Sequence, residues 1–337
     1  MASQTFQVAF RQQQAEFRRT SATISEGARQ PSDEKGKQYP YLLAHGYELE
    51  NLIPSLRPDD RATAFLQSRR IKWWKARACG DDRDGNTPTR NMASSQVSCI
   101  NFLLPLAAID GALETILKAI DPEVQAVETI AYDGQSSPVE FEWIGLGKSL
   151  EGTSSRGSKS TSTDALLVGR LADGAKRAYL IEWKCCEEYR HAGNKGDGES
   201  GKTRRSRYAP LYEAASSSFS GAVPMDALMF DPHYQLMRFF MLGDRMVSEQ
   251  ELGVRDFMVV VVCPGQNTAY RNTVTSPGLR DKFPEARTVR EAMRAVLRRP
   301  DSFHVVSQAV LVEAVRRSPV AAAARDWCDY HTQRYGW

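Results

Sequence analysis

A run of six apolar residues, from Phe257 to Val262, places the strongest constraint on how this chain folds. The run reads FMVVVV and has no polar position, which is typical of a strand whose two faces are both buried. Segments with helical periodicity lie on either side of it, at about 231–247 and 286–298. Because such strands occur in folds where helices cover both sides of a sheet, we predict an α/β fold.

Two earlier segments predict the rest of the sheet. The sequences TDALLVGRL (163–171) and RAYLIEWKC (177–185) form a strand pair joined by a turn around Asp173-Gly174. Farther upstream, 124–132 and 139–144 alternate well enough for a hairpin with Asp133-Gly134 in its connection. The resulting order of helix, strands, strand pair, helix and buried strand indicates a mixed central sheet flanked by helices.

The remaining segments set the predicted domain organisation. Residues 1–91 form an N-terminal helical extension, in which about 1–40 is a frayed arm or an exposed helix, and 92–337 form one domain. Ser94 or Ser95 caps a helix that runs to Ile120 and is broken or kinked at Pro105. A last helical section covers 305–327. The Gly- and polar-rich segments at 79–90, 145–162 and 190–207 are predicted to be loops.

Composition excludes several classes of protein. The 337 residues include 42% hydrophobic and 25% charged residues, which excludes a mainly disordered, collagen-like or coiled-coil chain. The six cysteines form no C-x-x-C pair, so we expect reduced thiols. No secretory leader or membrane-length apolar run is present, so we expect a cytoplasmic protein with no membrane contact. A net charge of +3 is too small to identify a nucleic-acid binder.

Three charged residues carry the most chemical information: Asp164, Glu182 and Lys184. Side chains alternate along a strand, so Glu182 and Lys184 share one face while Ile181 and Trp183 turn toward the core. We expect that face to be the more open one, with Asp164 across the strand pair. Two converging carboxylates repel each other unless a cation lies between them, and such oxygen ligands suit Mg²⁺ or Mn²⁺. Alternatively, the same residues form an ordinary exposed salt bridge.

The spacing of these residues resembles the PD-(D/E)XK nuclease superfamily, with Asp164 and Glu182-Trp183-Lys184 in the places of its motif. Thr163 replaces the usual proline. The segments MASSQVSCINFLLPL (92–106), STDALLV (162–168), IEWKCCEEY (181–189) and YQLMRFFML (234–242) resemble a bacterial branch of restriction-endonuclease-like proteins. The resemblance spans about 92–270. It implies an αβββαβ core, a DNA substrate and phosphodiester hydrolysis with Mg²⁺, or Mn²⁺ as a substitute, bound by Asp164 and Glu182.

The resemblance also implies an additional acidic residue upstream of Asp164. Glu142 and Glu140, both expected on one face of the strand VEFEW, are the better candidates, and Glu114 is the third. Gln235 matches a glutamine that often follows the active-site strands, where it touches the substrate backbone or supports the site. A solvated strand face and a helix-surface amide are the alternative interpretations.

The segment Arg190 to Arg207 is strongly basic, with six basic and two acidic side chains and a net charge of +4. Because it leaves the predicted active-site strand, we expect it to contact DNA phosphates. Its basic residues include Lys202, Arg204, Arg205 and Arg207. The alternative is a solvated loop without a ligand.

Residues 196–203 also match the phosphate-binding pattern G-x-x-x-x-G-K-[ST]. A polar spacer precedes the match and a basic stretch follows it, whereas such a loop needs a buried strand before it and a packed helix after it. We therefore predict a metal-dependent DNA endonuclease, for which a homodimer is one expected assembly. A non-catalytic nucleic-acid-binding protein on the same fold and a nucleoside triphosphatase are the alternatives.

Overall fold

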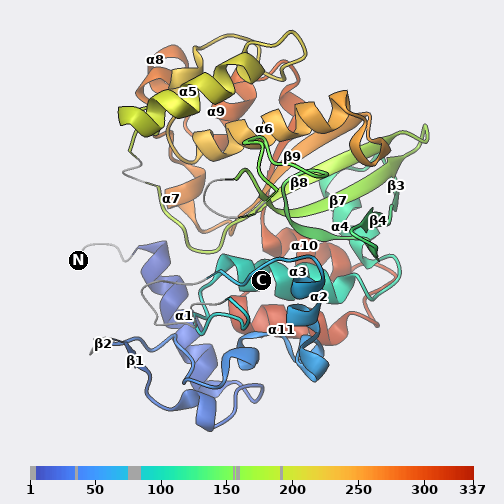
Figure 1. Ribbon diagram of the computed structural model, residues 1–337. Coiled ribbons are helices and arrows are strands. Elements are labelled where there is room, and N and C mark those ends of the chain that lie inside the picture. Colours follow the sequence, from blue (N-terminus) through green and yellow to red (C-terminus); the bar gives the residue numbers. More distant parts are fainter. Residues whose placement is uncertain (1–4, 35–36, 75–84, 155, 157–159, 190–192) are drawn as a thin grey trace.

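The computed structural model describes residues 5–34, 37–74, 85–154, 156, 160–189 and 193–337. A six-stranded mixed sheet runs through its centre in the order β10-β9-β8-β7-β3, and β6 also pairs with β7 (Figure 1). β8 runs antiparallel to β7 and parallel to β9, and β9 is parallel to β10. The strands are β3 (Val124–Val127), β6 (Glu140–Trp143), β7 (Thr163–Leu171), β8 (Lys176–Trp183), β9 (Asp256–Val262) and β10 (Phe303–Val306).

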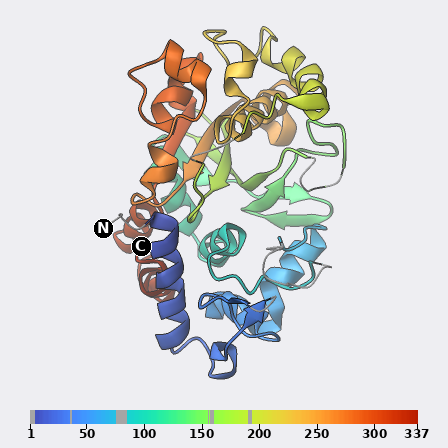
Figure 2. The ribbon, with the colours of Figure 1, turned by 90° about the vertical axis from the view of Figure 1, so that its left-hand side faces the viewer.

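Helices cover both faces of this sheet, as the sequence predicts (Figures 1 and 2). The helices of one face are α1 (Phe6–Thr20), α2 (Arg61–Ser68), α3 (Ser95–Leu106), α4 (Ala112–Ile120), α10 (Gln308–Arg316) and α11 (Arg325–Tyr335). Those of the other are α5 (Gly198–Tyr212), α6 (His233–Ser248), α7 (Thr268–Arg271), α8 (Pro277–Lys282) and α9 (Val289–Val296).

The apolar run in β9 supplies both cores. Met258, Val260 and Val262 pack in the core beneath α3 and α4, whereas Val259 and Val261 pack beneath α6. The prediction of a strand buried on both faces is therefore confirmed, because alternate side chains of one strand enter opposite layers.

The strand pair β7–β8 is confirmed, but the predicted hairpin between 124–132 and 139–144 is wrong. β3 pairs with the end of β7 and β6 with its beginning, so both upstream strands extend the same edge. The Asp133-Gly134 turn, where both residues have positive φ, instead joins two short strands. These are β4 (Ile130–Tyr132) and β5 (Gln135–Ser137).

The ends of the chain share one core. In α1, Phe10 and Phe17 are buried. Phe10 stacks on Tyr335 of α11, and Phe17 packs edge-on against Tyr330 of the same helix. α1 is therefore neither a frayed arm nor an exposed helix. The strands β1 (Asp33–Glu34) and β2 (Lys37–Gln38) and several 3-10 turns lie between α1 and α2, so the predicted N-terminal extension is only partly helical.

Three further predictions were tested by the structure. Ser94 caps α3 as expected, and the helix ends at Leu106, directly after Pro105. The predicted loop 190–207 is wrong in its second half, because α5 begins at Gly198. The predicted helix 305–327 is interrupted, since β10 covers its first residues and α10 and α11 follow. Residues 79–84, 155, 157–159 and 190–192 of the predicted loops lie outside the described residues.

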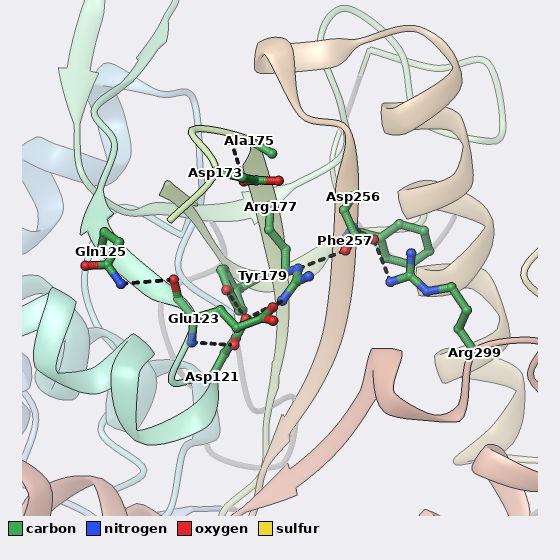
Figure 3. Close-up of polar contacts among 10 residues, drawn as sticks. All are labelled: Asp121, Glu123, Gln125, Asp173, Ala175, Arg177, Tyr179, Asp256, Phe257 and Arg299. Atoms are coloured by element: carbon green, nitrogen blue, oxygen red, sulfur yellow. Dashed lines mark hydrogen bonds and ion pairs between the residues drawn. The ribbon is translucent and has the colours of Figure 1, made fainter. Parts of the chain in front are cut away.

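A polar network fixes the beginning of β8 (Figure 3). Arg177 donates to Asp121 Oδ2 at 2.6 Å and to Asp256 Oδ2 at 2.8 Å, and Tyr179 also donates to Asp121. Burial opposes ionisation of Asp121, but the hydrogen bonds from Tyr179 and Arg177 lower its pKa below the ordinary value. The network joins β8, β9 and the residue after α4 at the end of β8 that is remote from Glu182.

In the part of the chain that the structure describes, no helix combines the length and the hydrophobicity needed to span a membrane.

Candidate active site

The β7–β8 pair brings Asp164 and Glu182 together. Ala165 pairs with Ile181, so the same register sets Asp164 opposite Glu182. The Trp183 amide donates a 2.7 Å hydrogen bond to Asp164 Oδ2, and Lys184 follows immediately after the strand. These charged residues line a cavity of about 440 Å³ whose walls also come from α1, α3 and α6.

The face that carries these residues is not the open face that the sequence suggests. Glu182 is 1% exposed and Lys184 is 5% exposed, because α6 covers this side of the sheet. An ordinary solvated salt bridge is therefore excluded for this pair. Burying charges without full pairing is costly, so charged groups retained here call for a functional explanation.

Lys184 is held by three partners. Its ammonium forms an ion pair with Glu182 Oε1 and donates to Tyr189 Oη and Gln235 Oε1, both at 3.2 Å. Burial disfavours its charged form, but the Glu182 carboxylate raises the pKa of Lys184 well above the ordinary value, so the residue is a cation. Gln235 thus lies where the resemblance places it and fixes the lysine.

Three buried carboxyl groups oppose one another's ionisation. Burial and the neighbouring Asp164 raise the pKa of Glu182 to about 8. Burial and Glu142 raise the pKa of Asp164 to about 7, and burial raises that of Glu142 to about 7. At neutral pH these three carboxyl groups are therefore only partly ionised, and ionisation of all three requires a cation in addition to Lys184.

Glu142 and Glu140 have different surroundings in the structure. Glu142 has a φ of +47°, an uncommon conformation for a residue with a side chain, and its carboxylate reaches the cavity. There it accepts hydrogen bonds from Ser162 Oγ at 2.7 Å and Gln96 Nε2 at 3.4 Å.

Glu140 is instead buried in an ion pair, with its Oε2 2.6 Å from Arg69 Nε, and it does not line the cavity. The expectation that both glutamates project from one face of the strand is therefore wrong. The positive φ of Glu142 breaks the regular alternation of side chains along the strand. Glu114, the third candidate, does not line the cavity. It lies on α4, where it forms an ion pair with Lys118.

The carboxylates fit a hard divalent cation. Glu182 Oε2 is buried without a hydrogen-bond partner, Oε1 is paired with Lys184, and Asp164 lies opposite. Carboxylate oxygens that are not fully paired suit Mg²⁺ or Mn²⁺ as ligands. Among the described residues, no three His, Cys, Asp or Glu side chains are already gathered closely enough to hold a metal ion.

The basic residues predicted to contact the substrate lie on α5, outside the cavity. Lys202 pairs with Glu199 and Arg205 with Asp226, each at 2.7 Å. Arg204 donates to the Lys195 carbonyl, whereas Arg207 is exposed. Arg190, the first basic residue of the segment, lies outside the described residues.

The segment 196–203 does not have the geometry of a phosphate-binding loop. β8 ends at Trp183, well before Gly196, and the helix already begins at Gly198. The Gly201 amide donates to the Asp197 carbonyl, and Lys202 is bound to Glu199. Such a loop needs free amides at the end of a strand, so this geometry gives the triphosphatase interpretation no support.

Sequence reasoning missed several residues that line the cavity, Gln7, Arg11, Gln96 and Tyr189, and it missed Ser162, which donates to Glu142. Gln7 and Arg11 belong to α1, where Gln7 donates to the carbonyl of Cys186, 179 residues away in the sequence. No spacing rule joins residues so far apart. Gln96 lies in the segment 92–106 that carries the resemblance, but its contact with Glu142 depends on the backbone at that glutamate.

Comparison with known proteins gives a single result. Neither the curated proteins nor the solved structures include a significant match to this chain. The family described as Restriction Endonuclease associating with ARP matches residues 11–336, which extends well beyond the 92–270 of the sequence resemblance. With nearly the whole chain covered, the protein belongs to the family of restriction endonucleases associating with ARP.

Proposed function

We propose that this protein is a metal-dependent DNA endonuclease of the PD-(D/E)XK type that acts in defence. One observation carries the proposal: Asp164, Glu182 and Lys184 converge at one cavity at the end of a strand pair. The element order α3, β6, β7, β8, α6, β9 supports it, because the αβββαβ core has the same order. Membership of a restriction endonuclease family supports DNA as the substrate.

Asp164 and Glu182 would hold Mg²⁺, or Mn²⁺ in its place. The ion supplies Lewis acidity at the scissile phosphate. Glu142 would add a third carboxylate, held by Ser162 and Gln96. Glu140 has no part in this set, because Arg69 neutralises it outside the cavity.

Lys184 would orient the attacking water and offset charge that develops on the phosphate in the transition state. Its ammonium is already fixed by Glu182, Tyr189 and Gln235, so little reorganisation is needed when the substrate binds. Gln235 and Tyr189 are positioning residues in this scheme, since they act through the lysine.

The exposed face of α5 would bind DNA phosphates nonspecifically. Lys202, Arg204, Arg205 and Arg207 lie on one helix, and Arg207 is exposed there. Charge at this distance from the cavity would contribute affinity but no chemistry.

Incubation of supercoiled plasmid with the protein in Mg²⁺, Mn²⁺ or EDTA tests the proposal. We expect nicked or linear product in either metal and none in EDTA, with Asp164→Asn inactive. DNA binding without product under any divalent metal would instead establish the non-catalytic alternative.

A further inference from the structure

A second, larger cavity adjoins the carboxylate cavity. Its volume is about 950 Å³, and it is lined by residues of β4, the segment after α2 and the segment after β6. Trp74 and Glu142 line both cavities, so the two spaces share a wall. A group bound in the larger cavity would therefore lie beside the carboxylates.

Trp74 is the most exposed large hydrophobic residue of the described chain, at 55%. The other tryptophans, Trp73, Trp143, Trp183, Trp327 and Trp337, are all buried. Leu146, another exposed apolar side chain at 46%, lines the same cavity. Exposed apolar surface concentrated at one cavity indicates a binding site.

The backbone of Trp74 is hydrogen-bonded to a residue that lines the carboxylate cavity. Its amide donates a 2.6 Å hydrogen bond to Gln96 Oε1, and the Gln96 amide group reaches Glu142. The preceding Trp73 is buried and donates to Thr63 Oγ1 at 2.9 Å. The exposed indole thus projects from an anchored segment whose position is coupled to a carboxylate of the active site.

Three cationic side chains lie beside the aromatic surface. Arg70, Lys72 and Arg156 line the cavity together with the carboxylates Asp133 and Glu142, and Arg70 forms an ion pair with Asp133 at 3.4 Å while its side chain stays 82% exposed. The guanidinium of Arg156 lies 5.7 Å from the centre of the Tyr132 ring. The same arginine donates to the backbone carbonyls of Glu142 and Arg69, at 2.7 and 3.0 Å, so it is held at the shared wall.

We propose that this cavity binds an unstacked nucleobase of the DNA strand whose phosphate enters the carboxylate cavity. The inference rests on the proposed nuclease function and adds a substrate class to it. Aromatic side chains beside cations are typical of sites that bind unstacked nucleobases. Any of the bases can stack on such a side chain, regardless of its identity. In a paired duplex, neighbouring bases cover those faces, so the base must come from a single strand or be extruded from a duplex.

Binding measurements in EDTA separate this interaction from cleavage. The probes are a fluorescently labelled thymidine oligonucleotide, the matching oligonucleotide of abasic residues, and a fully paired duplex. We expect the wild type to bind the thymidine strand more tightly than the abasic strand. Trp74→Ala should weaken binding of the thymidine strand by about 5- to 150-fold and leave binding of the abasic strand nearly unchanged.

Trp74 also offers a direct spectroscopic signal, because the other tryptophans are buried. The thymidine strand should quench tryptophan fluorescence in the wild type and not in Trp74→Ala. Tyr47→Ala is the matched control, since Tyr47 is an exposed aromatic residue (37%) that does not line the cavity. An effect of Trp74→Ala on the paired duplex would identify extrusion as the source of the base, and an effect confined to the single strand would identify unpaired DNA.

Equal binding of the thymidine strand by Trp74→Ala and wild type, with no loss of quenching, would overturn the inference. Wild-type cleavage of plasmid in Mg²⁺ would then leave the nuclease proposal standing. Absence of both cleavage and DNA binding in the wild type would overturn the two together.

Discussion

The Trp183 backbone amide donates a 2.7 Å hydrogen bond to Asp164 Oδ2. This bond crosses from β8 to β7 and holds the Asp164 carboxylate beside Glu182, where ionisation of both is disfavoured. The donor belongs to the strand backbone and does not depend on a rotamer of Trp183, so the strand pair itself supplies a partner that favours this position of the carboxylate. The carboxylates are therefore set for a cation before substrate arrives.

Glu142→Gln and Glu140→Gln should separate the roles of two neighbouring glutamates. The first removes a cavity carboxylate and should reduce cleavage by about 10- to 100-fold with little loss of stability. The second leaves Arg69 buried without a counter-charge and should lower the free energy of unfolding by about 3–5 kcal/mol, with cleavage by the folded protein retained.

Urea unfolding and cleavage rates, measured where both variants are folded, test this pair. An inactive Glu140→Gln beside an active Glu142→Gln would show that the wrong glutamate has been assigned to the cavity.

Metal-free stability should depend on pH through Glu182. Its pKa in the folded protein is about 8, above the ordinary 4.5, so the folded state binds more protons than the unfolded chain between these values. The contribution of Glu182 to stability is therefore present below about pH 4.5 and is lost as pH rises toward 8.

In EDTA, the wild type should lose more stability than Glu182→Gln between pH 5 and pH 8, because the variant has no carboxyl group to ionise at this position. Mg²⁺ should raise the melting temperature of the wild type more than that of the variant. A variant that loses as much stability as the wild type between pH 5 and pH 8, or that gains as much from Mg²⁺, would count against the assignment of Glu182 as a titrating metal ligand.

Arg207→Ala should weaken DNA binding for every sequence alike. Removing one phosphate contact should make the slope of log K against log salt less negative by about 0.9. The cleavage rate at saturating DNA should not change, because Arg207 does not line the cavity. Anisotropy titrations over a range of salt measure the slope, and an unchanged slope would remove Arg207 from the DNA-binding surface.

The sequence predicts the parts of the site that depend on neighbouring strands. Asp164 and Glu182 lie on strands joined by a tight turn, so alternation and register bring them together. Alternation failed at Glu142 because one residue with positive φ redirects the strand, and nothing in the sequence VEFEW indicates that conformation. The contact between Gln96 and Glu142 could not be predicted for the same reason, because it depends on the positive φ of Glu142.

Long-range packing explains the errors in the fold. The sequence predicts a loop over 190–207, which covers the first part of α5, because this part is polar; Gly201, Tyr208 and Tyr212 are the only buried residues of the helix. α1 was expected to be exposed because its partner, α11, lies at the other end of the sequence. In both cases the helix has only a narrow apolar face, and this face is buried against residues that lie far away in the sequence.

Single-turnover cleavage by Lys184→Ala and Lys202→Ala tests the central claim most directly. Both variants lose one ammonium group, but Lys184 is buried between Glu182 and Gln235, whereas Lys202 is exposed on α5. With DNA binding verified in EDTA, we predict that Lys184→Ala makes no product in Mg²⁺ and that Lys202→Ala cleaves at close to the wild-type rate. Undiminished cleavage by a folded Lys184→Ala protein would contradict the assignment of this cavity as the active site.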